Sequence, residues 1–111
     1  MKYAALIYTD PEHDAAVRDE ELPQYFAFGQ RGREAGKVVG GEELAPAPNA
    51  TTVRVREGEV LTTDGPFAET KEQLGGFYLL DCRDLDEAIE LASQIPGARH
   101  GVIEVRPLIE H

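Results

Sequence analysis

The pattern of apolar and polar residues along this chain predicts a mixed α+β fold. Residues 3–8 form a continuous apolar and aromatic run of strand length, as in a strand that is covered on both faces. Residues 52–56 alternate between apolar and polar, and residues 57–59 form a turn that leads to a second run at 60–63. These segments therefore predict a β-hairpin. Further strands are predicted at residues 37–41, 77–81 and 102–106.

The first predicted helix begins near Asp19 and runs to about Ala35. The acidic residues before Pro23 favour the positive end of a helix, and proline is tolerated in a first turn, so residues 9–18 are expected to form a loop. Gly36 suits the left-handed position that follows a helix. The apolar side of this helix is expected to consist of Leu22, Tyr25, Phe26 and Phe28.

The second predicted helix has the clearer signals. Asp84 is a suitable N-cap, and Glu87 lies three positions later, as in a capping box. Pro96 and Gly97 are expected to stop the helix. Apolar residues fall at helical spacing at Leu85, Ala88, Ile89, Ala92 and Ile95.

The order of these elements predicts one ferredoxin-like domain over residues 1–111, a split β-α-β arrangement with an inserted hairpin. Two helices can cover only one face of its sheet. Residues 3–8 and 77–80 nevertheless carry large apolar side chains at both parities, so the other face also requires burial. We therefore expect a homodimer with a barrel-like core between two sheets.

Composition narrows the range of partners and compartments. The 111 residues include 21 acidic and 11 basic residues, and the net charge of −10 works against binding to nucleic acid or an anionic membrane. Cys82 is the single cysteine, which fits a reducing cytoplasm, and its neighbour Asp81 favours a role in packing over one as a nucleophile. The apolar run at residues 3–8 is too short for a signal peptide, and no segment is long enough to span a membrane.

Turn-forming and ionisable residues are concentrated in the segment 64–76, whose sequence is DGPFAETKEQLGG. Gly65 precedes a proline whose φ is fixed, so the backbone that follows Asp64 has few accessible conformations. A connection between two strands needs far fewer residues, and an excess of this kind is typical of a binding loop or an interface.

This segment closely resembles the signature of the YCII-related proteins of the DGPF subgroup. The resemblance also includes Met1–Tyr3 and Tyr8, the helix that follows Asp84, and Val105–Pro107, so it extends over essentially the whole chain. It implies a dimeric α/β barrel whose biochemical role is mostly unassigned. Relatives in the wider superfamily include isomerases and dehydrochlorinases that act on cyclic or aromatic compounds by proton transfer, and many subgroup members are linked to extracytoplasmic-function sigma factors.

In this fold, the first strand ends at the sheet edge where the third and fourth core strands begin. We therefore hypothesise that Asp64 and His100 form an acid/base pair at that edge, acting on a small acidic or phenolic molecule. The residues expected to bind this substrate are Tyr8, Asp10, Lys71, Tyr78 and Arg99. No cofactor is predicted, because no dinucleotide or P-loop motif is present and the three histidines are too dispersed to indicate a metal site.

Structural explanations compete with each of these roles. Asp64 also suits a turn in which its carboxylate binds nearby backbone amides, Lys71 suits an ion-pair cluster with Glu69 and Glu72, and His100 suits an exposed loop. The rival to an enzyme is a non-catalytic dimer that senses a ligand or binds a partner in a sigma-factor system. An enzyme requires a closed pocket with at least two polar groups from this edge, whereas the rival requires only a broad negative surface.

Overall fold

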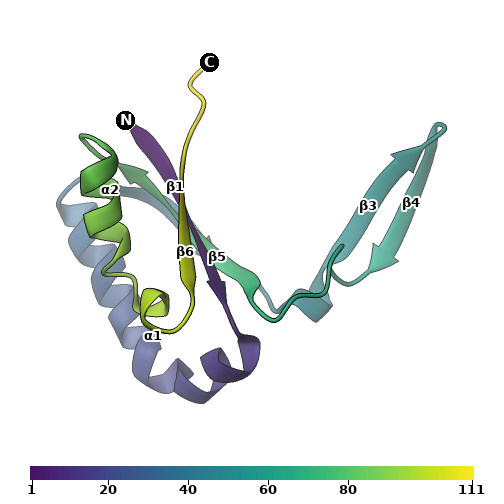
Figure 1. Ribbon diagram of the computed structural model, residues 1–111, viewed down its shortest axis with the longest axis horizontal. Coiled ribbons are helices and arrows are strands. Elements are labelled where there is room, and N and C mark those ends of the chain that lie inside the picture. Colours follow the sequence, from purple (N-terminus) through teal and green to yellow (C-terminus); the bar gives the residue numbers. More distant parts are fainter.

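A four-stranded antiparallel sheet in the order β2-β5-β1-β6 forms the body of the molecule in a computed structural model that describes residues 1–111. This strand order, together with two helices and an inserted hairpin, confirms the predicted ferredoxin-like α+β fold (Figure 1). The elements are β1 Lys2–Thr9, α1 Pro11–Glu34, β2 Val38–Glu43, a 3₁₀ turn η1 Ala47–Asn49, β3 Thr51–Arg56, β4 Glu59–Asp64, β5 Gln73–Asp81, α2 Leu85–Ala92, a 3₁₀ turn η2 Pro96–Arg99 and β6 Val102–Pro107.

Both helices pack on one face of the sheet, and the core lies between them and the strands. Alternate residues of β1 point into this layer, where Tyr3, Ala5 and Ile7 are buried. The core also contains Phe28 from α1, Ala88 and Ala92 from α2, and Leu80, Cys82 and Ile95. Cys82 is therefore a core residue, as expected, and burial raises the pKa of its thiol. No helix is both long enough and apolar enough to cross a membrane.

The predicted start of α1 was wrong by two turns, because residues 11–18 are helical. Asp10 caps the helix by accepting a hydrogen bond from the Glu12 N–H at 3.0 Å, and Pro11 occupies the first helical position. Pro23 thus lies inside the helix, where it removes a backbone donor, and α1 bends around the end of the sheet (Figure 1). Phe26 is 66% exposed and does not belong to the buried side.

The second helix begins as predicted but ends earlier. Asp84 accepts a hydrogen bond from the Glu87 N–H at 2.9 Å, so it is the N-cap. α2 ends at Ala92, and Ile95 lies in the following turn while remaining buried. Leu85 and Ile89 are about half exposed, so Ala88, Ala92 and Ile95 are the members of the predicted apolar stripe that face the core.

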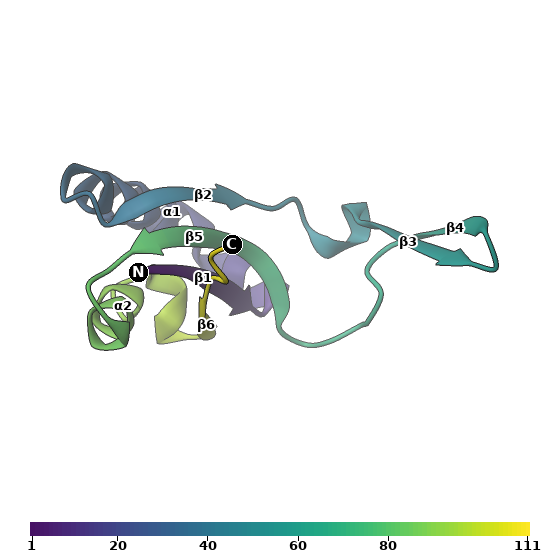
Figure 2. The same ribbon diagram turned by 90° about the horizontal axis from the view of Figure 1, so that it is seen from above.

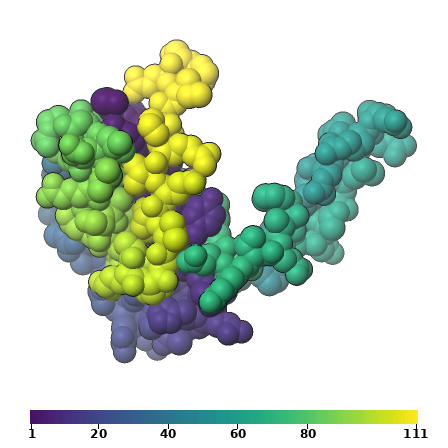
Figure 3. Space-filling model, viewed as in Figure 1, coloured from purple at the N-terminus to yellow at the C-terminus, as the bar shows by residue number.

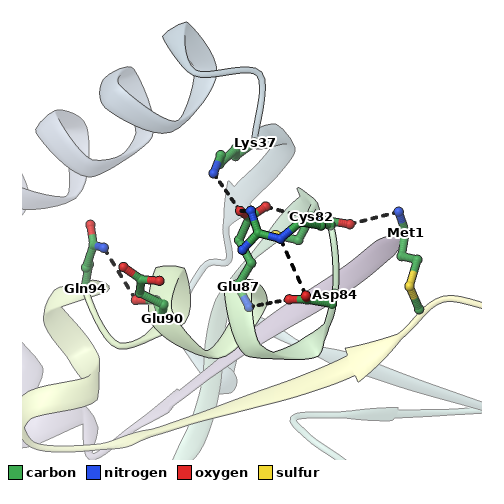
Figure 4. Close-up of polar contacts among 8 residues, drawn as sticks. Met1, Lys37, Cys82, Asp84, Glu87, Glu90 and Gln94 are labelled. Atoms are coloured by element: carbon green, nitrogen blue, oxygen red, sulfur yellow. Dashed lines mark hydrogen bonds and ion pairs between the residues drawn. The ribbon is translucent and has the colours of Figure 1, made fainter.

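A polar cluster at the start of α2 ties this helix to the end of α1. The Glu87 carboxylate lies 2.8 Å from both the Lys37 ammonium and the Arg83 guanidinium, and it accepts a hydrogen bond from the Arg83 backbone N–H at 3.0 Å (Figure 4). Lys37 immediately follows Gly36, which has φ 74° and ends α1 in the left-handed conformation as predicted. The hydrogen bond from Lys37, together with that from Arg83, lowers the pKa of Glu87.

The β3–β4 hairpin does not join the main sheet but projects from it as an arm. Figures 1 and 2 show the arm extending beyond the ends of β2 and β5, on the side away from both helices. Its base is closed by a hydrogen bond from the Gly65 N–H to the Ala50 carbonyl at 2.7 Å and by one from the Thr52 hydroxyl to the Gly65 carbonyl. No arm residue belongs to the core.

The face of the sheet opposite the helices, called the open face below, is uncovered in the single chain. Leu6 pairs with Phe77, and Ala4 pairs with Leu79, so these side chains share this face. Each of the four is only partly buried. Leu74 and Val102 also lie on this face and are 38% and 50% exposed, so the second apolar face expected from the sequence is present.

The Glu87 cluster predicts a specific response to acid. Because the pKa of Glu87 is lower in the folded state than its ordinary value of 4.5, its contribution to stability is present above that value and is lost as the pH falls through the folded pKa. Glu87→Gln is expected to destabilise the protein at pH 7 and to flatten the fall in unfolding free energy below about pH 4.5. Urea unfolding from pH 7 to pH 2.5 measures this, with the exposed Glu90→Gln as control. Parallel pH profiles for the Glu87→Gln variant and the wild type would contradict the prediction.

Candidate functional site

A partly open cavity of about 380 Å³ lies between α1 and the edge of the sheet formed by β2 and β5. Residues of α1 at helical spacing form one wall, and β1, β2 and β5 form the other. The residues of α1 in this wall are Asp14, Arg18, Glu21, Leu22, Tyr25, Phe26, Gly29 and Arg33. A second hollow, bounded by residues 43–48 and 73–75, adjoins the cavity at Asp14 and Arg18.

Glu21 is the buried carboxylate of this cavity. It is 7% exposed and reaches the wall from the middle of α1. The Nε2 atom of His100 lies 3.0 Å from each of its carboxylate oxygens, and the Arg99 guanidinium lies 3.3 Å from one of them. A buried carboxylate needs such partners, because an isolated charge is costly to remove from water. The contact between Glu21 and His100 joins α1 to the end of η2, and the two residues are 79 positions apart in the sequence.

His100 occupies a mostly buried position behind Glu21. Its side chain is 15% exposed, and its ring packs against that of His13, with centroids 4.3 Å apart and ring planes tilted by 50°. The second ring nitrogen, Nδ1, is buried without a hydrogen-bond partner. The alternative interpretation of His100 as an exposed loop residue was therefore wrong.

Two tyrosines complete the polar wall. Burial raises the pKa of Tyr25 to about 12, and the negative charges of Asp14 and Glu21 add to this effect. Burial also raises the pKa of Tyr78, whose ring packs edge-on against Phe28 with centroids 5.0 Å apart. Both phenols therefore stay protonated near neutral pH, and the Tyr78 hydroxyl donates a hydrogen bond to the Tyr25 backbone carbonyl at 3.4 Å.

The structure gathers only part of the predicted site. Arg99 and His100 meet at Glu21, and Tyr78 lines the cavity. Asp10 lies at the same sheet edge, where it caps α1. Tyr8 alternates with the buried Ile7 and Thr9, so it lies on the open face rather than in the cavity.

Asp64 and Lys71 lie away from these groups. Asp64 is the last residue of β4 at the base of the arm, and it is exposed (Figure 1). Lys71 is exposed in the following loop and forms no ion pair within the chain, so an ion-pair cluster that steadies this loop was wrong, whereas one that steadies a dimer stays a prediction. Within one chain, the carboxylate that His100 contacts is that of Glu21. The pairing of Asp64 with His100 stays a prediction.

The site predicted from the sequence lacks the acidic and basic residues of α1 that line the cavity. Asp14, Arg18, Glu21 and Tyr25 fall at helical spacing and form one stripe, but this pattern becomes visible only if the helix starts at Pro11. The signal was the pair Asp10–Pro11, a suitable N-cap and first helical residue, followed by the acidic residues Glu12 and Asp14 in the first turn.

Three residues of this cluster have the ligand types of a cation site. One ligand atom from each of Asp14, Glu21 and His100 lies within 4.8 Å of the others. The Arg99 guanidinium already supplies positive charge to Glu21, and the Thr9 hydroxyl donates to Asp14 at 3.0 Å. These contacts satisfy the carboxylates without an ion, so the arrangement fits proton transfer more closely than metal binding.

Charges of both signs line the cavity. Arg18 pairs with Glu43 at 3.0 Å, whereas Arg33 forms no ion pair, and its guanidinium folds back over Gly29. Gly29 is two helical turns from Glu21, about 12 Å along the axis of α1. A substituted ring with an anionic group could therefore contact the carboxylate at one end and the guanidinium at the other.

Comparison with known proteins agrees with this fold. A family model described as "YCII-related domain" matches residues 1–111. An uncharacterized protein of Rhizobium meliloti is 44% identical over 114 residues, which cover 97% of this chain and 92% of that protein. Among solved structures, the chain is similar to 5-chloro-2-hydroxyhydroquinone dehydrochlorinase from Burkholderia phenoliruptrix in complex with 2,5-dihydroxybenzoquinone. The TM-score is 0.64 and the sequence identity is 14%. The alignment covers 100% of this chain and 96% of the dehydrochlorinase chain.

The raised pKa of Tyr25 predicts a loss of stability in alkali. An unfolded phenol ionises near 10, whereas Tyr25 in the folded state ionises near 12, so its contribution to stability is present below pH 10 and is lost as the pH rises to about 12. Tyr25→Phe is expected to remove the last step of phenolate absorbance in an ultraviolet pH titration, whereas Tyr8→Phe retains it. A final step unchanged by Tyr25→Phe would assign it to another tyrosine.

Proposed function

Because this chain belongs to the YCII-related family, we propose that it is a small-molecule lyase or isomerase that acts by acid/base chemistry on a cyclic substrate with a phenolic or carboxylate group. The observation that carries the proposal is the buried Glu21 carboxylate, which lines the cavity and contacts His100 from behind. The structural neighbour supports the reaction class, because that protein is a dehydrochlorinase and its structure holds a dihydroxybenzoquinone.

In the proposed reaction, Glu21 accepts a proton from a C–H or O–H group of the substrate. The electron pair of the broken bond moves into the ring system, and the protonated phenol of Tyr25 donates a hydrogen bond to the oxygen on which charge develops. In a lyase, the leaving group departs with its own electron pair. In an isomerase, the proton returns at another atom. Neither route requires an oxidant or a reductant.

The remaining groups position the reactants. His100 holds the Glu21 carboxylate in place, and Arg99 also contacts that carboxylate. Arg33 binds the anionic group of the substrate, because it is the arginine of the cavity wall without an ion pair. The apolar face of Tyr78 packs against the ring.

A second copy of the chain is part of this proposal. Covering the open face removes Leu6, Phe77 and Leu79 from water, and the same patch on both copies is what a two-fold dimer requires. The sigma-factor association implied by the family resemblance stays a prediction.

The acid/base role predicts a large loss of turnover on substitution of Glu21. Glu21→Gln removes the proton acceptor while keeping the shape, so kcat is expected to fall about 10²- to 10⁴-fold with a smaller change in KM. The assay follows product formation across a panel of halogenated hydroquinones, aromatic acids and lactones. The matched control is Glu20→Gln, which changes the adjacent exposed residue.

Binding is measured separately by calorimetry with 2,5-dihydroxybenzoquinone. Full turnover by the Glu21→Gln variant would refute the role of Glu21. A third outcome is that the wild type turns over no compound of the panel but binds the quinone, and that Arg33→Ala weakens this binding. That outcome would indicate a ligand sensor instead of an enzyme.

The dimer predicts that a charge on the open face separates the two copies. Leu79→Asp is expected to shift the mass in light scattering at micromolar concentration from dimer to monomer, because the open face cannot bury an unpaired carboxylate. The control is Ile89→Asp on the exposed side of α2. Circular dichroism checks that both variants fold. A wild type that is monomeric in this assay would refute the dimer.

A further inference from the structure

The β3–β4 arm is amphipathic although no part of its own chain covers it. Pairing of Val55 with Val60 and of Val53 with Thr62 places the three valines on one side of the hairpin. They are 60% (Val53), 58% (Val55) and 68% (Val60) exposed. The other side carries Arg54, Arg56, Glu59 and Leu61. A two-stranded hairpin alone in water is marginal, so this valine face requires a partner surface.

The total surface of the chain gives the size of the missing contact. Its accessible surface is 7703 Å², whereas a compact monomer of 12.2 kDa exposes about 6,100 Å². The radius of gyration is 15.7 Å, against about 13 Å for a compact chain of 111 residues. The excess of about 1,600 Å² per chain lies in the range that one protomer of an obligate homodimer buries.

The shape of the molecule indicates where a partner fits. Figure 3 shows an open notch between the body and the arm, and Figure 2 shows that the arm continues outward past the sheet. A second copy that packs on the open face would lie within reach of the arm. By two-fold symmetry, its own arm would reach back to the first copy.

Charge does not oppose contact between the arm and a second copy of the chain. Residues 51–63 contain two arginines and two glutamates, so the arm is neutral and the whole net charge of −10 resides on the rest of the chain. Two such bodies repel each other, and a neutral apolar arm adds contact area between them without adding repulsion.

We propose that the β3–β4 arm is an intermolecular clasp that packs its valine face, Val53, Val55 and Val60, against the body of a second copy of this chain. This inference rests on the dimer described under the proposed function. Residues 44–48, which lead from β2 toward the arm, and residues 73–75 at the start of β5 line the hollow beside Asp14 and Arg18. Clasping would therefore also hold in place one wall of this hollow, which adjoins the substrate cavity.

The first test compares two adjacent residues of β4 that face opposite sides of the arm. Val60→Asp charges the valine face, and Leu61→Asp places the same charge on the polar face. Sedimentation equilibrium is expected to show dimerisation weakened at least ten-fold by Val60→Asp and within two-fold of the wild type for Leu61→Asp. Equal dimerisation of both variants and the wild type would overturn the clasp.

A second measurement does not depend on tolerance of a buried charge. The photo-crosslinker benzoylphenylalanine in place of Val60 is expected to give a covalent dimer on irradiation, whereas in place of Leu61 it gives mostly monomer. Crosslinks from position 60 that stay within one chain would overturn the proposal.

The results of these experiments distinguish a failure of the clasp from a failure of the proposed function. If Leu79→Asp is monomeric while Val60→Asp dimerises normally, the dimer stands and the clasp is wrong. If the wild type is monomeric, the clasp and the dimer are both wrong. The Glu21→Gln assay reports on the chemistry in either case.

Discussion

The buried carboxylate of Glu21 is the interaction on which the candidate site depends. It connects the middle of α1 to the turn before the last strand, through His100 at 3.0 Å and Arg99 at 3.3 Å. A buried carboxylate is tolerated only with partners of this kind, because the removal of one partner leaves a buried charge without compensation. The same contact therefore fixes the position of α1 and places an acid/base group in the cavity wall.

The shape of the domain follows from a second constraint, the small number of its helices. Two helices cover one face of a four-stranded sheet, and the core that they enclose contains only ten buried apolar residues. The open face and the arm remain as two further apolar surfaces. A small domain that exposes this much apolar surface gains stability by association, so the same sequence features that build the fold also favour a second copy.

The sequence predicted the fold more completely than the site. Periodicity located every strand of the sheet and both helices, because alternation and helical spacing are local properties. It misplaced the start of α1, since Pro23 resembled a first-turn proline while the real first-turn proline is Pro11. That error hid Asp14, Arg18 and Glu21. Of the residues predicted for the site, Tyr78, Arg99 and His100 lie in or beside the cavity, whereas Asp64 lies at the base of the arm.

By itself the sequence determined the α+β class, the central position of the first strand, the N-cap of α2 and the presence of an amphipathic hairpin, because each of these depends on neighbouring residues. Only the tertiary structure decided that Glu21 meets His100, that Tyr8 faces away from the cavity and that the hairpin stands apart from the sheet. Those outcomes depend on how α1 bends and on which face of the sheet it covers. Contacts between residues nearly 80 positions apart leave no periodic signal in a single sequence.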